Sequence, residues 1–312
     1  MEEANGHERP GPPLRLRLFG ILRLERPDGT EIPQPKGGGK GYGIMAGREV
    51  LSYLALHRGW VDSETLRRRI LGPGEVRSLE QQQASINNGV SHVRTWAQGG
   101  LAAELRASLS AMELRGFAID RDPKRGYRLN SENVWVDVRD FEDAIAEARR
   151  SEHPEPALRR ALELYTGDLL TNYGRPGNSQ REPFLFRDAI GVYLRGDACL
   201  AADRLAAILQ DKGRPEEALQ MVTSLLDGAV CELLERRAMA IEGEASPRGL
   251  GDRTRVHKRW QRLRDRLTSE LGAGTEPEPA TLGTYGSDHA FLRGVDGPFS
   301  GSCHQPLSPA VR

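Results

Sequence analysis

The pattern of apolar residues changes once along this chain of 312 residues, near position 130, and that change limits the folds that the chain can adopt. Before position 130, stretches in which apolar and polar residues alternate lie between stretches with a helical period. Only helical periods follow, as far as about position 271. A chain of this length can form two domains. We therefore expect a mixed domain at 14–130, an all-α domain at 131–285, and a fold that is mostly α with small β elements.

Two predicted hairpins mark the ends of the N-terminal domain. The stretch LRLRLFGILRLERPDGTEI alternates apolar and polar residues and contains Pro27-Asp28-Gly29, which favours a turn. Short antiparallel strands are therefore expected between positions 14 and 32. In FAIDRDPKRGYRL, Asp122-Pro123 opens a basic turn and Gly126 closes it, which predicts a second hairpin with Tyr127 packed against the core.

Three helices are predicted between the hairpins. REVLSYLALHRGWV, from Arg48, has an apolar stripe, and VDSETLRRRILG begins with Asp62 or Ser63 as an N-cap. The third helix spans about 79–96, and the stretch at 98–116 predicts another helix or an ordered insertion. PKGGGKGYG, before the first helix, is expected to be a flexible loop. It lacks the spacing of a phosphate-binding loop, so nucleotide binding is not expected there.

The third helix contains residues that weaken helices, in the stretch INNGVSHVRTWA. A glycine inside a helix costs about 1 kcal/mol relative to alanine, so something other than helix stability selected Gly89. On a helical wheel, Ile86, Val90 and Val93 form a narrow apolar arc opposite a face of short polar side chains with almost no charge. Gly89 lies at the edge of this arc, and we interpret it as a site of close packing or a local bend.

The second domain is predicted to consist of amphipathic helices, beginning with VRDFEDAIAEARR and ALELY. The stretch GRPEEAL joins two later helices as in a tetratricopeptide hairpin, where Pro215 starts the second helix and Ala218 permits close approach. Tails at 1–13 and 286–312 are predicted to be disordered, the second because it is rich in Gly, Ser and Pro. Further helices are expected at about 184–209, 216–226, 231–241 and 253–271.

Composition excludes several classes of protein. No apolar run reaches the length of a membrane span, and the N-terminus does not resemble a signal peptide, so a cytoplasmic protein without membrane contact is expected. Three widely spaced cysteines suit neither a disulfide framework nor a metal site. No Ser-His-Asp or Cys-His arrangement can be drawn from the sequence alone. We therefore expect no enzymatic activity, no metal and no cofactor.

Charge is balanced overall but unevenly distributed. Between positions 14 and 129 there are 19 Lys and Arg against 12 Asp and Glu, an excess of seven, whereas the rest of the chain is acidic. Such asymmetry is typical of a basic binding domain, although an excess of this size also suits an ordinary solvated surface.

The order of the motifs resembles that of a known family. REVLSYLALHRGWVDSETLRRRILG, INNGVSHVRTWA and PKRGYRL resemble the first two helices, the recognition helix and the wing of the OmpR/PhoB-type winged helix-turn-helix domain. VDVRDFEDAIAEA, ALELYTGDLL, GRPEEAL and LTSELGAGTEPEPATL resemble the bacterial transcriptional activation domain, a tetratricopeptide-like (TPR-like) helical domain. The combination is similar to the SARP family, actinobacterial activators of antibiotic and other secondary-metabolite gene clusters.

The resemblance implies that the third helix enters the DNA major groove and that the second hairpin lies over the neighbouring minor groove or backbone. The residue types agree, because asparagine can pair with adenine edges and cations can contact phosphates. The predicted base-facing residues are Asn87, Asn88, Ser91, His92 and Thr95. The predicted backbone or wing contacts are Arg94, Arg121, Lys124 and Arg125.

The resemblance also implies partners. We expect a sequence-specific transcriptional activator that binds tandem direct repeats in double-stranded DNA, self-associates head to tail on them, and recruits RNA polymerase. The loop at about 73–78 is a second candidate for polymerase contact. An alternative stays open, because net charge is zero and the third helix is poor in charge: a TPR-like protein-interaction scaffold whose winged helix no longer binds DNA.

Overall fold

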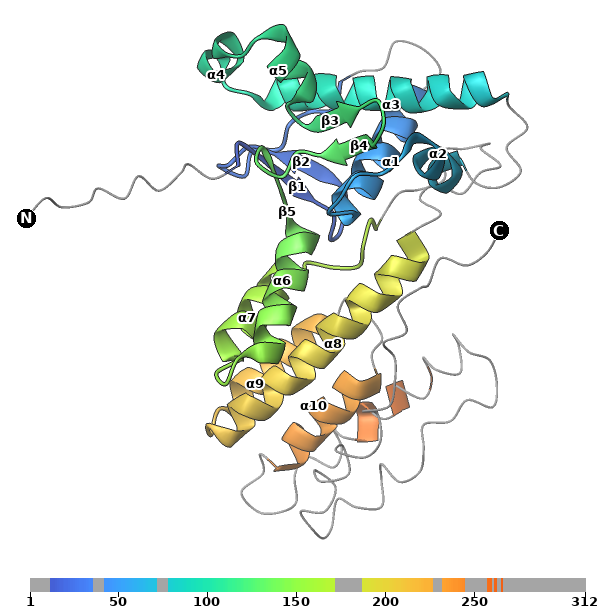
Figure 1. Cartoon of the computed structure of the whole chain (residues 1–312). Coiled ribbons are helices and arrows are strands. Elements are labelled where there is room, and N and C mark those ends of the chain that lie inside the picture. Colours follow the sequence, from blue (N-terminus) through green and yellow to red (C-terminus); the bar gives the residue numbers. More distant parts are fainter. Residues whose placement is uncertain are drawn as a thin grey trace, which may run out of the picture.

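The computed structural model describes residues 12–35, 42–71, 78–171, 187–226 and 232–244, together with 257–259, 261–262 and 265. Ten named helices and five short strands are found in these residues, which confirms a fold that is mostly α with small β elements. Figure 1 shows two halves. The strands and α1 to α5 form the upper half, and α6 to α10 form the lower half.

A three-stranded sheet lies at the base of the upper half. Strand β1 (Leu14–Arg17) pairs antiparallel with β2 (Arg23–Glu25) and parallel with β5 (Val134–Val136). Leu16 stands opposite Leu24 and Val136, and all three are buried. The strands predicted between 14 and 32 are confirmed. The parallel partner after position 130 was not predicted, because three residues are too short to show a pattern.

Helices α1 (Tyr42–Leu56), α2 (Ser63–Leu71) and α3 (Leu79–Gly100) correspond to the three predicted helices. Helix α1 begins at Tyr42, so the last residues of the glycine-rich stretch are helical rather than loop. Asp62 caps α2, because its Oδ1 accepts the Thr65 amide at 2.8 Å. Helix α3 begins with a capping box and continues beyond the predicted end.

The stretch between α3 and the second hairpin forms two short helices, α4 (Ala103–Ser108) and α5 (Ala111–Gly116). The hairpin itself consists of β3 (Ile119–Asp122) and β4 (Gly126–Leu129), as predicted. It lies beside α3 and α1 in Figure 1.

The lower half is a stack of paired helices, and each pair lies against the next. At the turn before α9, Gly213 has a φ of +71°, and Ala218 is fully buried, as the predicted hairpin requires. Most of the predicted helix at 253–271 and nearly all of both predicted tails lie outside the described residues. The helices of this half are α6 (Asp137–Arg150), α7 (Glu155–Leu164), α8 (Arg187–Asp211), α9 (Pro215–Leu226) and α10 (Glu232–Glu244).

Two charged residues at the start of α6 join the halves. The Asp137 carboxylate accepts the amides of Leu18 at 2.9 Å and Phe19 at 3.1 Å, beyond the end of β1. The Arg139 guanidinium donates to the carbonyls of Leu54, Ala55 and His57, at the C-terminal end of α1. The His57 amide also donates to the Leu54 carbonyl at 3.3 Å, and the last carbonyls of a helix otherwise lack partners within it. The first turn of α6 therefore holds both the sheet and α1.

A second contact between the halves follows α7. Residues 168–171 run alongside 18–20: the Leu170 amide donates to the Leu18 carbonyl at 2.9 Å, and the Gly20 amide to the Asp168 carbonyl at 2.9 Å. The Phe19 ring lies edge-on to Phe141 and Tyr165, with centroid distances of 5.3 and 5.0 Å. One continuous apolar core spans both halves. The change of pattern at position 130 is therefore not a hinge.

Candidate functional site

The outer face of α3 carries short polar side chains. Asn88, Ser91 and Thr95 are exposed and follow one another along the helix. Thr95 Oγ1 donates back to the Ser91 carbonyl at 3.1 Å. Within the described part of the chain, the side chains of Asn88 and Ser91 make no hydrogen bond. This face therefore presents donors and acceptors to solvent.

Two glycines let α3 lie close against α1. A Cβ atom on Gly89 would stand 2.9 Å from the backbone carbonyl of Ala46, and one on Gly47 would stand 2.8 Å from the His92 ring. Ile86, Val90 and Val93 are buried beside this crossing point. The predicted close packing at Gly89 is therefore found, and a rigid neighbour supports the outer face from behind.

Alanine at Gly89 is expected to destabilise the protein, although alanine is the better helix former. The new methyl group meets backbone atoms that cannot rotate away, so we expect overpacking near the upper end of the usual range, about 3 kcal/mol, against the roughly 1 kcal/mol of helix propensity gained. Gly99 is the matched control in the same helix, because a Cβ there has no neighbour within 4 Å. Gly99→Ala should raise the free energy of unfolding by about 0.5 kcal/mol. Urea unfolding of both variants measures the difference, and equal signs would contradict this packing.

His92 turns toward α1. Its half-buried ring lies against Gly47, with Nε2 at 3.4 Å from Gln34 Nε2. Burial lowers the pKa of His92, and the charge of Arg48 lowers it further. The imidazole is therefore neutral at pH 7 and packs at the edge of the contact between the helices.

Asn87 and Arg94 connect α3 to the hairpin. Asn87 Oδ1 accepts the Tyr127 hydroxyl at 3.0 Å and the Gln83 amide at 3.3 Å. The half-buried Arg94 guanidinium donates from Nη2 to the Ile119 carbonyl at 3.2 Å, and burial lowers its pKa. Of the predicted contact residues, these two and His92 therefore contact polar groups on other elements of the protein.

The hairpin tip presents cations on a fixed turn. Asp122 Oδ1 accepts the backbone amides of Lys124 at 2.8 Å and Arg125 at 2.9 Å, and these hydrogen bonds lower the pKa of Asp122. The side chains of Arg121, Lys124 and Arg125 are exposed. No ion pair involving these three cations is found within the described residues.

Val61 fixes the hairpin to the rest of the upper half. Its amide and carbonyl exchange two hydrogen bonds of 2.8 Å with Tyr127. Gly126 has a φ of +98°, and a Cβ there would stand 2.1 Å from the Val61 carbonyl oxygen. The Arg128 guanidinium lies 4.8 Å from the centre of the Trp60 ring and forms an ion pair with Asp120. The tip therefore has a defined position relative to α3.

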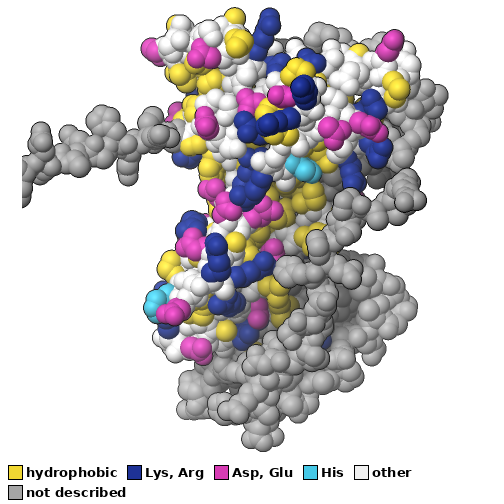
Figure 2. All heavy atoms as spheres, in the orientation of Figure 1, with side chains coloured by type: hydrophobic (Ala, Val, Ile, Leu, Met, Phe, Trp, Pro, Cys, Tyr) yellow, Lys and Arg dark blue, Asp and Glu magenta, His cyan; other side chains and the backbone are white. Residues whose placement is uncertain are grey.

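Charge on this surface is mixed. Figure 2 shows Lys and Arg side chains spread over the upper half with acidic side chains among them, rather than one continuous basic patch. The outer face of α3 carries uncharged polar groups, and the neighbouring hairpin tip carries cations, so the two surfaces differ in chemistry.

The sequence did not indicate Gln34, Trp60 or the Asn87–Tyr127 contact. The local sequence pattern does not indicate these contacts, because in each one the two residues lie on different elements of the fold. The predicted loop at 73–78 lies almost entirely outside the described residues. Among the described residues there is no group of three or more potential metal ligands, and no helix with the length and apolar character needed to cross a membrane.

Comparison with known proteins found no match, either to a protein-family model or to a curated protein.

Proposed function

We propose that this protein is a sequence-specific DNA-binding transcriptional activator. Helices α1 to α3 and the β3–β4 hairpin are then a winged helix-turn-helix domain of the OmpR/PhoB type, and α6 to α10 a TPR-like activation domain. The observation that carries the proposal is the outer face of α3. It displays uncharged hydrogen-bonding groups on a helix packed rigidly against α1, beside a hairpin with exposed cations.

In this proposal, α3 enters the major groove and reads base edges. Asn88 is the strongest candidate, because an asparagine amide can pair with adenine through two hydrogen bonds, worth about 1 to 3 kcal/mol of discrimination. Ser91 and Thr95 can address several bases. Asn87, His92 and Arg94 act mainly as positioning residues, since their partners within the protein set the depth and angle of the helix.

The hairpin supplies affinity without reading sequence. Arg121, Lys124 and Arg125 would contact phosphates, and such contacts make binding fall steeply as salt concentration rises. With so few exposed cations, one domain binds weakly. Two protomers on direct repeats would bind more tightly, because the second contact becomes effectively intramolecular.

The joint between the halves supports a role in recruitment. Because Asp137 and Arg139 fix α6 to the sheet and to α1, a domain bound to DNA would orient the helical half relative to the promoter. That half would contact RNA polymerase. By its resemblance the protein would regulate an antibiotic gene cluster, acting in the cytoplasm with double-stranded DNA as its partner and no cofactor.

The direct test is footprinting of the full chain on the region upstream of its own gene. We expect protection of two spaced repeats on one face of the duplex, with affinity that drops as salt rises. Retention of no DNA even at low salt would contradict the proposal.

Paired substitutions separate the two surfaces. Asn88→Ala with Ser91→Ala is expected to flatten sequence preference, with the specific site weakened about tenfold or more and nonspecific binding unchanged. Lys124→Ala with Arg125→Ala should weaken all DNA sequences alike and reduce the dependence on salt. Competition gel shifts with specific and random duplexes measure both. Equal losses from the two pairs would contradict the assigned roles.

One observation favours the scaffold alternative. On α8, Val192, Tyr193 and Leu200 are 66%, 74% and 59% exposed, an unusual set of large apolar side chains at the surface. A helical half that holds a protein partner without DNA binding would use such a face. The footprint decides between the two functions.

A further inference from the structure

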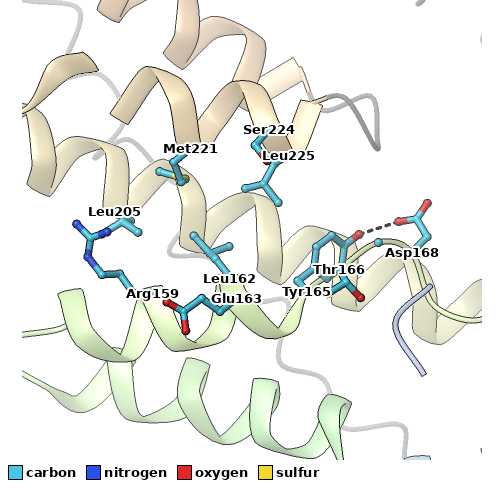
Figure 3. Close-up of a pocket in the computed structure, with 11 residues that line it drawn as sticks. Arg159, Leu162, Glu163, Tyr165, Thr166, Asp168, Leu205, Met221, Ser224 and Leu225 are labelled. Carbon is cyan, nitrogen blue, oxygen red and sulfur yellow. Dashed lines mark hydrogen bonds between the residues drawn. The ribbon is translucent and has the colours of Figure 1, made fainter. Parts of the chain in front are cut away.

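A pocket of about 360 Å³ opens between α7, α8 and α9 in the helical half. Its volume falls in the range of small-molecule sites, roughly 300 to 1,000 Å³. Figure 3 shows side chains from all three helices converging on it. The apolar part of the lining consists of Leu162, Leu205, Met221 and Leu225.

The apolar floor can be reached from solvent. Leu162, Met221 and Leu225 are only partly buried, whereas Leu205 beneath them belongs to the core. Covering such surface is favourable by about 25 cal/mol for each Å² removed from water. The floor therefore favours a ligand with an apolar body.

The charges at the rim determine the sign of the ligand. Arg159 forms ion pairs with Glu155 and Glu217, each at 2.8 Å, and Lys212 and Arg214 pair with the same two carboxylates. Asp168 is paired with Arg195 and accepts the Tyr165 hydroxyl at 2.7 Å. Figure 3 shows the Tyr165–Asp168 contact.

Glu163 differs from these lining residues. It lines the pocket and is exposed, and within the described residues its carboxylate has no cationic partner. The hydroxyls of Thr166 and Ser224 add further hydrogen-bonding groups to the lining. Among the charged side chains that line the pocket, the Glu163 carboxylate is therefore the one that forms no ion pair within the described residues.

We propose that this pocket binds a small amphipathic amine, with its apolar body on the leucine and methionine floor and its protonated nitrogen beside Glu163. Carboxylates and phosphates are disfavoured, because Glu163 repels them and the arginines near the pocket are already paired. The site shares no residue with the α3 face to which DNA binding is assigned.

The pocket is also connected to the upper half. Thr166 and Asp168 line it, and the same segment continues into the strand-like contact with 18–20: Thr166 Oγ1 donates to the Phe19 carbonyl at 3.3 Å, and the Thr171 amide donates to the Gly20 carbonyl at 2.7 Å. A bound amine stabilises this contact. Through this contact the bound amine would regulate DNA binding, an inference that rests on the proposed function.

Calorimetry on the full chain tests the site without DNA, with 4-phenylbutylamine, 4-phenylbutan-1-ol and 5-phenylpentanoate as probes of similar shape. We expect the amine to bind about fivefold more tightly than the alcohol, the upper range for an exposed ion pair, and the carboxylate to bind most weakly. Glu163→Gln should reduce the affinity for the amine to that for the alcohol. Glu152→Gln, an exposed carboxylate in the turn before α7, should change nothing.

A blocking variant tests the location. Ser224→Trp places an indole over the pocket from the exposed side of α9 and should abolish binding of amine and alcohol alike, with the melting temperature retained. Equal affinity for the three probes, a preference that survives Glu163→Gln, or binding that survives Ser224→Trp would overturn the proposal.

Hydrogen exchange tests the linkage separately. Saturation with 4-phenylbutylamine should slow exchange of the Gly20, Leu170 and Thr171 amides several-fold. Unchanged exchange at these amides during saturation would overturn the linkage. Because neither measurement contains DNA, a failure here is distinct from a failure of the footprint.

Discussion

Gly126→Ala is expected to lower the free energy of unfolding by about 4 kcal/mol and to detach the β3–β4 hairpin. Two effects combine. The positive φ of 98° strains any residue with a Cβ, at about 1 to 3 kcal/mol. The added methyl group would also stand 2.1 Å from the Val61 carbonyl oxygen and 2.6 Å from Asp62 Cα, both backbone atoms that cannot rotate away. Urea unfolding of the full chain measures the loss.

Gly29→Ala separates strain from collision. Gly29 has a φ of +85° in the turn after β2, but a Cβ there has no neighbour within 4 Å. Strain alone therefore applies, and we expect a loss of about 1 kcal/mol. Similar losses in the two variants would contradict the tight contact between Gly126 and Val61. If the proposed function holds, only Gly126→Ala should also weaken DNA binding.

The sequence identified the turn at Gly126, but it did not show why a substitution there should cost so much stability. The pattern around Asp122-Pro123 indicated a hairpin through local preferences, and those preferences act within a few residues. The collision arises with Val61, which belongs to the segment between α1 and α2. Contacts of this kind depend on tertiary packing, and a single sequence carries no direct signal of them.

The sequence could predict which residues of α3 face outward, but not the direction that each side chain takes. A helical wheel correctly divided Ile86, Val90 and Val93 from the polar residues, because helical geometry alone determines that division. It could not show that Arg94 folds back to the Ile119 carbonyl or that His92 packs against Gly47. Both lie at the border of the face, where a neighbouring element decides the direction of a long side chain.

The joint between the halves was least accessible from the sequence. The expected boundary at position 130 followed from local periodicity, yet β5 lies beyond it and completes the N-terminal sheet. Leu18 and Asp137 are 119 residues apart, and the Leu18 backbone amide donates to the Asp137 carboxylate, a contact that leaves no mark on hydropathy. A buried carboxylate in the stretch VDV is a feature that only the fold explains.

Asp137 is expected to make stability depend on pH. Burial raises the pKa of Asp137 to about 6, although the Leu18, Phe19 and Val138 amides act in the opposite direction. The folded protein therefore holds this proton over a range where the unfolded chain, with an ordinary aspartate pKa near 4, has released it. The free energy of unfolding should fall as pH rises from about 4 to about 6, by about 3 kcal/mol for a shift of about two units, and level off above.

Asp137→Asn isolates this contribution, because it keeps the shape of the side chain and cannot titrate. The difference in unfolding free energy between wild type and variant should decline between pH 4 and 6. Asp137→Ala removes the acceptor altogether and leaves the backbone amides of Leu18 and Phe19, just after β1, without this partner. Each unsatisfied buried group costs about 1 to 3 kcal/mol, so we expect a loss of about 4 kcal/mol at pH 5. A difference that rises with pH would mean that the three amides outweigh burial. In that case the carboxylate would itself hold the two halves together, rather than being tolerated by them.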